Sequence, residues 1–167
     1  MTTATNAPVE DEHSLLKFSL AIEVMRSVGE AQLTVGGASM LPSIWPGDIL
    51  EIHRVGADLA RGDIVVFARD NRLVVHRVLG VNRERDEVIL LTQGDRSPRA
   101  DSPVSANELL GKVRAIRRGH RNIIPRRTRW TQTAAWVLRR SDLCTRVLLH
   151  LAAVRRNSST PAMVWAD

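Results

Sequence analysis

The sequence predicts a mainly β fold: a compact antiparallel domain with one helix before it and basic amphipathic helices after it. Short apolar runs, separated by polar turns and without intervening helices, fill the middle of the 167-residue chain. Both flanking parts of the chain instead have the apolar spacing of amphipathic helices. We therefore expect a disordered leader over residues 1–13, the β domain with its helix over 14–118, and a basic helical extension over 119–167.

The helix that precedes the sheet is expected over residues 14–29. Ser14 can cap its start and Gly29 is a plausible stop. Its partly apolar face consists of Leu15, Leu16, Leu20, Ile22, Val24 and Val28. Charged residues interrupt the stretch, so it lacks the run of about 18 or more apolar residues that a membrane-spanning helix needs.

Strands with polar connections are expected after this helix. They cover Leu33–Val35, Asp48–Val55, Ile64–Ala68, Leu73–Val81, Val88–Thr92 and Leu109–Arg117. Asp70 and Asn71 form a tight connection, which makes the two strands around them a hairpin. Residues 94–103 form an irregular loop with two prolines.

Composition and charge limit the possible functions. The chain is 44% hydrophobic and 25% charged, as in ordinary globular proteins. The lone Cys144 cannot form an intramolecular disulfide, and no Cys/His cluster has zinc spacing, so we expect no metal and no cofactor. Residues 1–111 carry eleven basic and sixteen acidic side chains, whereas residues 112–156 carry thirteen basic and one acidic. The basic charge is therefore concentrated in the C-terminal part.

This basic tail has three interpretations. It can be a solvated face packed on the domain, or an interfacial helix in which Trp130, Trp136 and the arginines contact an anionic membrane surface. Nucleic acid is the least favoured partner because no DNA-binding motif is recognisable. Without a secretory signal or a spanning helix, the protein is expected to be cytoplasmic or peripheral to a membrane.

One serine, Ser39, lies on a loop suited to exposing a nucleophile. Gly36 and Gly37 permit a close approach of the backbone, and Pro42 biases the residue before it towards an extended conformation. A serine hydroxyl becomes a good nucleophile only when a neighbouring base takes its proton. An isolated serine of this kind is more often part of a surface turn.

His76 is the candidate base. It lies in the expected strand Leu73–Val81, where an ordinary core histidine is also possible. Burial disfavours the imidazolium, so a working base at this position needs a carboxylate beside it. Asp95 and Asp101, both on the following loop, can supply that carboxylate, although aspartates are also common in turns. The choice between them stays open.

These segments, in this order, resemble the signal peptidase I family, which shares a clan with the LexA-like repressors. Residues 37–44 and 46–48 resemble its nucleophile box, Ser-Met-x-Pro-Thr/Ser followed by Gly-Asp, and residues 61–67 resemble the next box. The bacterial majority then has a lysine base. Here the corresponding strand, residues 74–78, has a histidine. Together with Thr92-Gln93-Gly94-Asp95 and Asp101, this histidine is similar to the endoplasmic-reticulum, archaeal and sporulation-type branch.

The resemblance, which covers about residues 35–113, implies a serine endopeptidase that cleaves a precursor or leader peptide after small residues. Ser39 would attack the peptide carbonyl, and His76 would transfer the proton. The backbone amide of Ser39 would also contribute to the oxyanion hole. The remaining implied site residues are Asp95 or Asp101, which would orient the histidine, and Met40 and Pro42, which would contact the substrate. Many relatives have a serine where this chain has Gly37, so a second oxyanion donor is not evident.

Two other functions are alternatives to a serine endopeptidase. A LexA-like self-cleaving regulator predicts a lysine base and an Ala-Gly or Cys-Gly cleavage site, and neither occurs here. A degenerate peptidase fold used as a non-enzymatic adaptor is disfavoured because Ser39, His76 and both aspartates are present.

Overall fold

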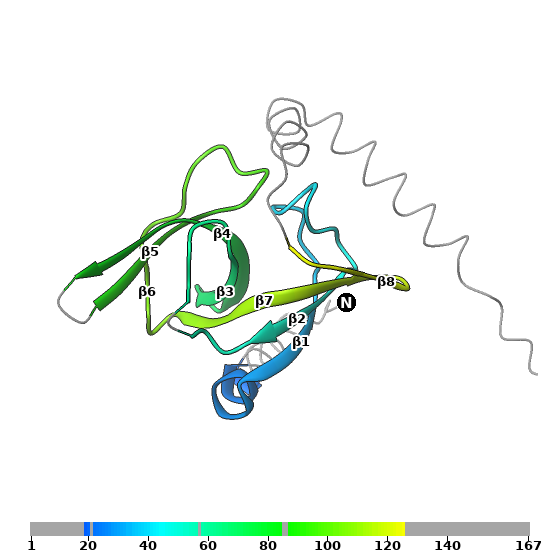
Figure 1. The fold of residues 1–167 in the computed structure, drawn as a ribbon, viewed down its shortest axis with the longest axis horizontal. Helices are drawn as coiled ribbons and strands as arrows, with labels where there is room; N and C mark the ends of the chain where they lie inside the picture. Colours follow the sequence, from blue (N-terminus) through cyan, green and yellow to red (C-terminus); the bar gives the residue numbers. More distant parts are fainter. Residues whose placement is uncertain (1–18, 21, 57, 85–86, 126–167) are drawn as a thin grey trace, which may run out of the picture.

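The computed structural model of the chain describes residues 19–20, 22–56, 58–84 and 87–125. Their strands form one antiparallel sheet (Figure 1). Its strands are β1 (Glu30–Thr34), β2 (Ile49–His53), β3 (Ile64–Arg69), β4 (Arg72–Glu84), β5 (Glu87–Gln93), β6 (Val104–Ser105), β7 (Leu109–Arg118) and β8 (Arg121–Ile123). The spatial order is β1-β2-β7-β3-β4-β5-β6, and β8 pairs with β7. The predicted mainly antiparallel β fold is therefore confirmed.

Two short strands were not expected from the sequence. β6 has two residues, which is too short for an alternating pattern to be recognised. β8 begins at Arg121 and pairs with β7, with Ile123 opposite Ile116. The sheet therefore continues past residue 118, where we expected the β domain to end.

Residues 19, 20 and 22–28 are helical, and the helix ends at Gly29 as expected. Gly29 has a φ of 80° and donates its N–H to the carbonyl of Met25 at 3.2 Å, which is typical of a glycine that ends a helix. The inward face differs from the expected one. Met25 is buried, whereas three residues of the expected apolar face are exposed: Leu20, Val24 and Val28.

The other expected terminal features, the disordered leader, the Ser14 cap and the basic helical extension with its possible membrane surface, lie outside the described residues. Among the described residues, no helix is long and apolar enough to cross a membrane.

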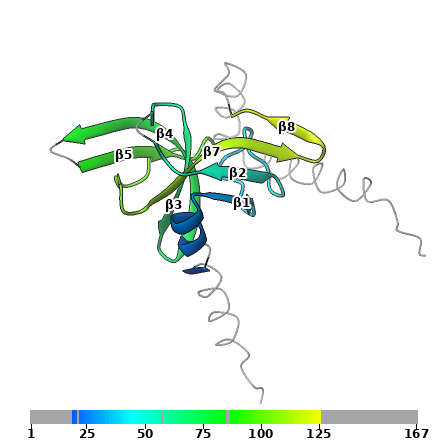
Figure 2. The same cartoon turned by 60° about the horizontal axis from the view of Figure 1, so that its bottom comes forward.

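The hairpin of β3 and β4 has a two-residue turn. Asp70 and Asn71 have φ values of 50° and 56°, the left-handed conformation that such turns require and that these two residue types tolerate. β4 is long and changes partner: it pairs with β3 up to Arg77 and with β5 from Arg77 onward. The second part of β4 and its partner β5 project beyond the rest of the sheet as an arm (Figures 1 and 2).

This change of partner leaves part of β4 open. Residues 72–76 pair with β3 along one edge, and no described strand pairs with their other edge. β1 is the terminal strand of the sheet, so its outer edge is also unpaired among the described strands. Both open edges lie near the loop that follows β1.

The sheet has a hydrophobic cluster on each face, because alternate side chains of a strand point to opposite sides. β3 contributes to both clusters and is central to the core. One cluster consists of Met25, Met40, Ile44, Leu50, Ile52, Ile64, Val66, Leu110, Val113 and Ile116. The other consists of Leu59, Val65, Phe67, Val78, Leu90 and Val104.

Candidate functional site

Ser39 lies on the loop between β1 and β2, and backbone hydrogen bonds close the base of this loop. The N–H of Val35 donates to the carbonyl of Asp48 at 2.9 Å, and the N–H of Gly47 donates to the carbonyl of Val35 at 2.7 Å. Gly47 has a φ of 88°, which favours glycine. Ser39 itself is exposed, and the residues that anchor the loop in the core are Met40, Leu41 and Ile44.

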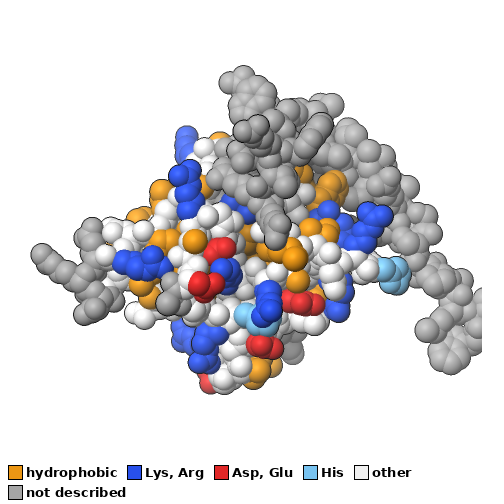
Figure 3. All heavy atoms as spheres, in the orientation of Figure 1, with side chains coloured by type: hydrophobic (Ala, Val, Ile, Leu, Met, Phe, Trp, Pro, Cys, Tyr) orange, Lys and Arg blue, Asp and Glu red, His pale blue; other side chains and the backbone are white. Residues whose placement is uncertain are grey.

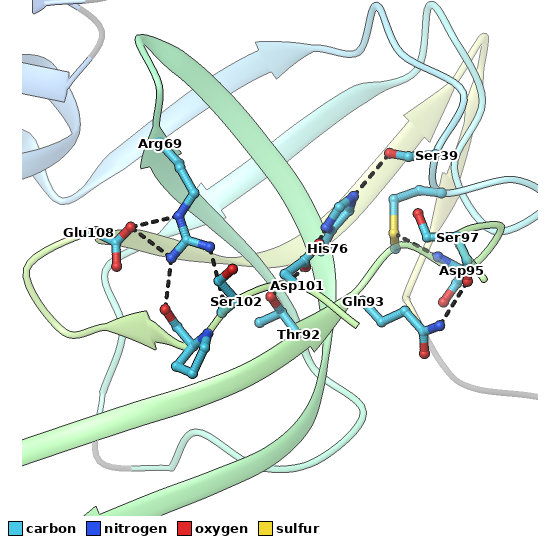
Figure 4. A network of polar contacts seen from close by, with 12 residues as sticks. Ser39, Arg69, His76, Thr92, Gln93, Asp95, Ser97, Asp101, Ser102 and Glu108 are labelled. Carbon is cyan, nitrogen blue, oxygen red and sulfur yellow. Dashed lines mark hydrogen bonds and ion pairs between the residues drawn. The ribbon is translucent and has the colours of Figure 1, made fainter. Parts of the chain in front are cut away.

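His76 is positioned by β4, opposite Val65 of β3, and faces Ser39 (Figure 4). Its Nε2 lies 3.2 Å from Oγ of Ser39, at hydrogen-bonding distance. The imidazole is largely buried, with 8% of the residue exposed, while the serine is open to solvent. A substrate can therefore reach the hydroxyl without displacing the histidine.

Asp101 lies on the other side of the imidazole. Its Oδ2 is 2.6 Å from Nδ1 of His76. An ionised carboxylate only accepts hydrogen bonds, so the network assigns the proton to Nδ1. Nε2 is then left as an acceptor that faces the hydroxyl of Ser39. The three side chains thus form a continuous hydrogen-bonded series.

Thr92 holds Asp101 in this position. The fully buried Thr92 donates its hydroxyl to Oδ2 of Asp101 at 2.7 Å, and its carbonyl accepts the N–H of Asp101 at 2.9 Å. The residue pattern alone assigns Thr92 no role. The available signal was a hydroxyl on the buried face of β5, two residues after Leu90.

Asp95 occupies a different position from Asp101. Its carboxylate accepts two hydrogen bonds from Arg77, from Nε at 2.8 Å and from Nη2 at 2.7 Å. Arg77 is only 3% exposed and also donates to the carbonyl of Gly62 and to the hydroxyl of Ser43. Of the two aspartates considered for His76, the structure brings Asp101 to the imidazole and Asp95 to the guanidinium.

The loop after β5 packs against Ser39. The N–H of Arg96 donates to the carbonyl of Ser39 at 2.8 Å. A Cβ atom on Gly94 would lie 2.9 Å from Nε2 of His76, 2.9 Å from the carbonyl oxygen of Ser39 and 2.7 Å from Oγ of Ser97. Only glycine fits at this close approach, which the sequence analysis did not foresee.

A second ion pair fixes the segment that follows Asp101. Arg69 donates to Glu108 at 2.8 Å and to the carbonyls of Ser102 and Pro103 (Figure 4). The backbone N–H of Ser105 is the main cause of a lowered pKa of Glu108; burial opposes this effect, and the Arg69 guanidinium adds to it. Glu108 therefore stays ionised, and paired with Arg69, at pH values below the ordinary pKa of a glutamate.

A cleft of about 360 Å³ opens beside Ser39 and His76. It is bounded by the end of β1 with the following residues 35–37, by Met40 and Ile44, and by residues 72–76 of β4. Met40 thus lies where a substrate contact was expected. Pro42 does not line the cleft among the described residues; its carbonyl accepts the indole N–H of Trp45 at 2.9 Å.

On the face drawn in Figure 3, basic side chains are spread among acidic and apolar ones. Within the described ranges, no group of three or more His, Cys, Asp or Glu side chains is placed to hold a metal ion.

Comparison with known proteins gives two findings. The sequence model of the family "Peptidase S24-like" matches residues 3–113. Signal peptidase I W of Bacillus subtilis (strain 168) is 32% identical over 76 residues, which is 43% of this chain. The chain spans 40% of the length of that curated relative.

Proposed function

Because the chain belongs to the Peptidase S24-like family, we propose that it is a serine endopeptidase of the signal-peptidase type, which cleaves precursor or leader peptides after small residues. The observation that carries the proposal is the hydrogen-bonded series from Ser39 through His76 to Asp101. The similarity to a protein named signal peptidase I supports the same class of substrate.

In the proposed reaction, Oγ of Ser39 attacks the carbonyl carbon of the scissile peptide bond and gives its proton to Nε2 of His76. Asp101 stabilises the imidazolium. The carbon–nitrogen bond then breaks, and the leaving amine takes the proton from His76. A water molecule, deprotonated by the same histidine, attacks the acyl-enzyme ester, which releases the acid product and returns the proton to Ser39.

The open edges of the sheet support a peptide as the substrate. The cleft lies between residues 33–37, at the end of β1, and residues 72–76 of β4. Both segments have backbone groups that no described strand pairs with, so an extended peptide can add to them by main-chain hydrogen bonds. The scissile bond then lies beside Ser39, at the end of the cleft.

Cleavage of synthetic peptides with an Ala-x-Ala segment tests this proposal. The wild-type protein is expected to cut after the second alanine, located by mass spectrometry of the products. Ser39→Ala and His76→Ala should each abolish the cut, whereas Ser27→Ala, which changes an exposed serine on the helix, should not. Absence of cleavage by the wild type across a panel of small residues before the cut would contradict the proposal.

A further inference from the structure

The cleft beside Ser39 contains one permanently charged side chain. Arg72, at the start of β4, lines it together with mainly apolar neighbours, and no Asp or Glu belongs to its described lining. Arg72 is exposed, and its side chain makes no hydrogen bond or ion pair with any described residue. Among the described residues, no acidic side chain neutralises this cation in the cleft.

The neighbouring arginines differ from Arg72 in this respect. Arg69, its partner across the hairpin, is paired with Glu108, and Arg77 is paired with Asp95. These two guanidinium groups connect segments that are distant in the chain, and each already binds a carboxylate. No described residue binds the guanidinium donors of Arg72, which suit the carboxylate of a bound partner.

The position of Arg72 along β4 indicates how far from Ser39 and His76 a bound acidic group would lie. Arg72 precedes His76 by four residues, so both side chains lie on the same face of the strand. At a rise of about 3.3 Å per residue, the two positions are about 13 Å apart. An extended peptide that runs parallel to β4, with its N-terminal side towards Arg72, would place the fourth residue before the scissile bond opposite Arg72.

We propose that Arg72 makes the cleft selective for peptides with an acidic residue, Asp or Glu, at the fourth position before the cut. This inference rests on the proposed peptidase function, because it assumes that the extended chain in the cleft is the substrate. The apolar lining then accepts the small residues nearest the cut, and Arg72 sets the charge preference farther along the same peptide.

Binding by the Ser39→Ala variant tests the selectivity without requiring turnover. Three fluorescent Ala-x-Ala peptides that differ only in Asp, Asn or Lys at the fourth position before the cut are titrated by anisotropy. The Asp peptide should bind about two- to fivefold more tightly than the Asn peptide, the range expected for a solvent-exposed ion pair. The preference should shrink in 0.5 M salt, roughly three times the physiological ionic strength, because exposed charges are screened.

Charge reversal identifies the residue responsible. In the Ser39→Ala background, Arg72→Glu should invert the preference in favour of the Lys peptide, and Arg72→Gln should abolish it. Arg114→Glu is the matched control, since Arg114 is an exposed arginine that lines a different hollow. Unfolding midpoints near that of the parent protein establish that each variant is folded.

Two outcomes would overturn the inference: equal binding of the three peptides, including no binding of any, or an Asp preference that persists in Arg72→Glu. An Asp preference that follows Arg72 while the wild type hydrolyses none of the peptides would show that Arg72 selects the charge of a bound peptide and would remove the proposed peptidase function.

Discussion

Asp101 and His76 are joined by a 2.6 Å hydrogen bond between Oδ2 and Nδ1, although they are 25 residues apart in the chain. His76 is on β4, and Asp101 follows the strand that pairs with the next part of β4. Antiparallel pairing of β4 with β5 returns the chain to the imidazole, and Thr92 fixes the carboxylate there. The bond depends on the topology of the sheet.

Asp101→Asn should lower kcat strongly while leaving the protein folded. An amide can donate to Nδ1 and favour the wrong tautomer, and it cannot stabilise the imidazolium as a carboxylate does. Replacing the aspartate of a serine–histidine–aspartate triad reduces kcat by up to about 10⁴-fold. Steady-state cleavage of an Ala-x-Ala peptide measures this effect, and an unchanged kcat would show that Asp101 has no part in the reaction.

Asp95→Asn is the matched comparison, and its expected effect is on stability. The substitution leaves the buried guanidinium of Arg77 without its carboxylate. Breaking a buried ion pair by removing one partner costs about 3–5 kcal/mol. The urea midpoint should fall accordingly, and a midpoint equal to that of the wild type would contradict this assignment.

Gly94→Ala should abolish most activity, because the added methyl group would press on Nε2 of His76 and on the carbonyl of Ser39. Gly80→Ala is the control. A Cβ atom at Gly80, on β4, meets no atom within 4 Å, so kcat/KM should stay near the wild-type value. Equal activity of the two variants would mean that the loop after β5 does not need this close approach.

Gly37→Ser should increase kcat. The resemblance to signal peptidase I implies a serine donor at this position, and a Cβ atom there meets no atom within 4 Å, so the side chain can be accommodated. An oxyanion-hole donor is worth roughly 10²–10³-fold in rate, and a donor added without further adjustment should recover part of that factor. Gly37→Ala should leave kcat unchanged. The expectation fails if the serine variant is no faster than the alanine variant.

Glu108 should make stability depend on pH in the acid range. Its pKa in the folded protein lies below its ordinary value of 4.5, chiefly because the N–H of Ser105 bonds the carboxylate, so the folded state binds a proton less readily. The stabilisation is complete above the ordinary value and is lost as pH falls through the folded pKa. Urea midpoints measured from pH 7 to pH 3 should fall more steeply for the wild type than for Glu108→Gln. Parallel curves would contradict this explanation.

Much of the fold could be predicted from the sequence. The strands are short apolar runs, and polar turns separate them, as at Asp70 and Asn71. The buried face of the helix could not be predicted in the same way. Its apolar residues lie on more than one side, and only the packing of Met25 against the sheet decides which side faces inward.

The candidate site was predictable to a similar extent. The residue types on the Ser39 loop and on β4 pointed to a nucleophile and a base before their separation was known. The choice between Asp95 and Asp101 could not be made, because both follow β5 on one loop. The pairing of the two aspartates depends on the two faces of β4. The adjacent side chains of His76 and Arg77 point in opposite directions, so His76 binds Asp101 and Arg77 binds Asp95.

The central claim is that Ser39 becomes acylated by the substrate with His76 as its base. Its most direct test is mass spectrometry of the protein quenched with acid during turnover of an Ala-x-Ala peptide, together with the turnover of Ser39→Ala. The predicted result is the N-terminal part of the peptide attached to Ser39 in the wild type, with neither adduct nor cleavage in Ser39→Ala. Cleavage by Ser39→Ala at the wild-type rate would contradict the claim.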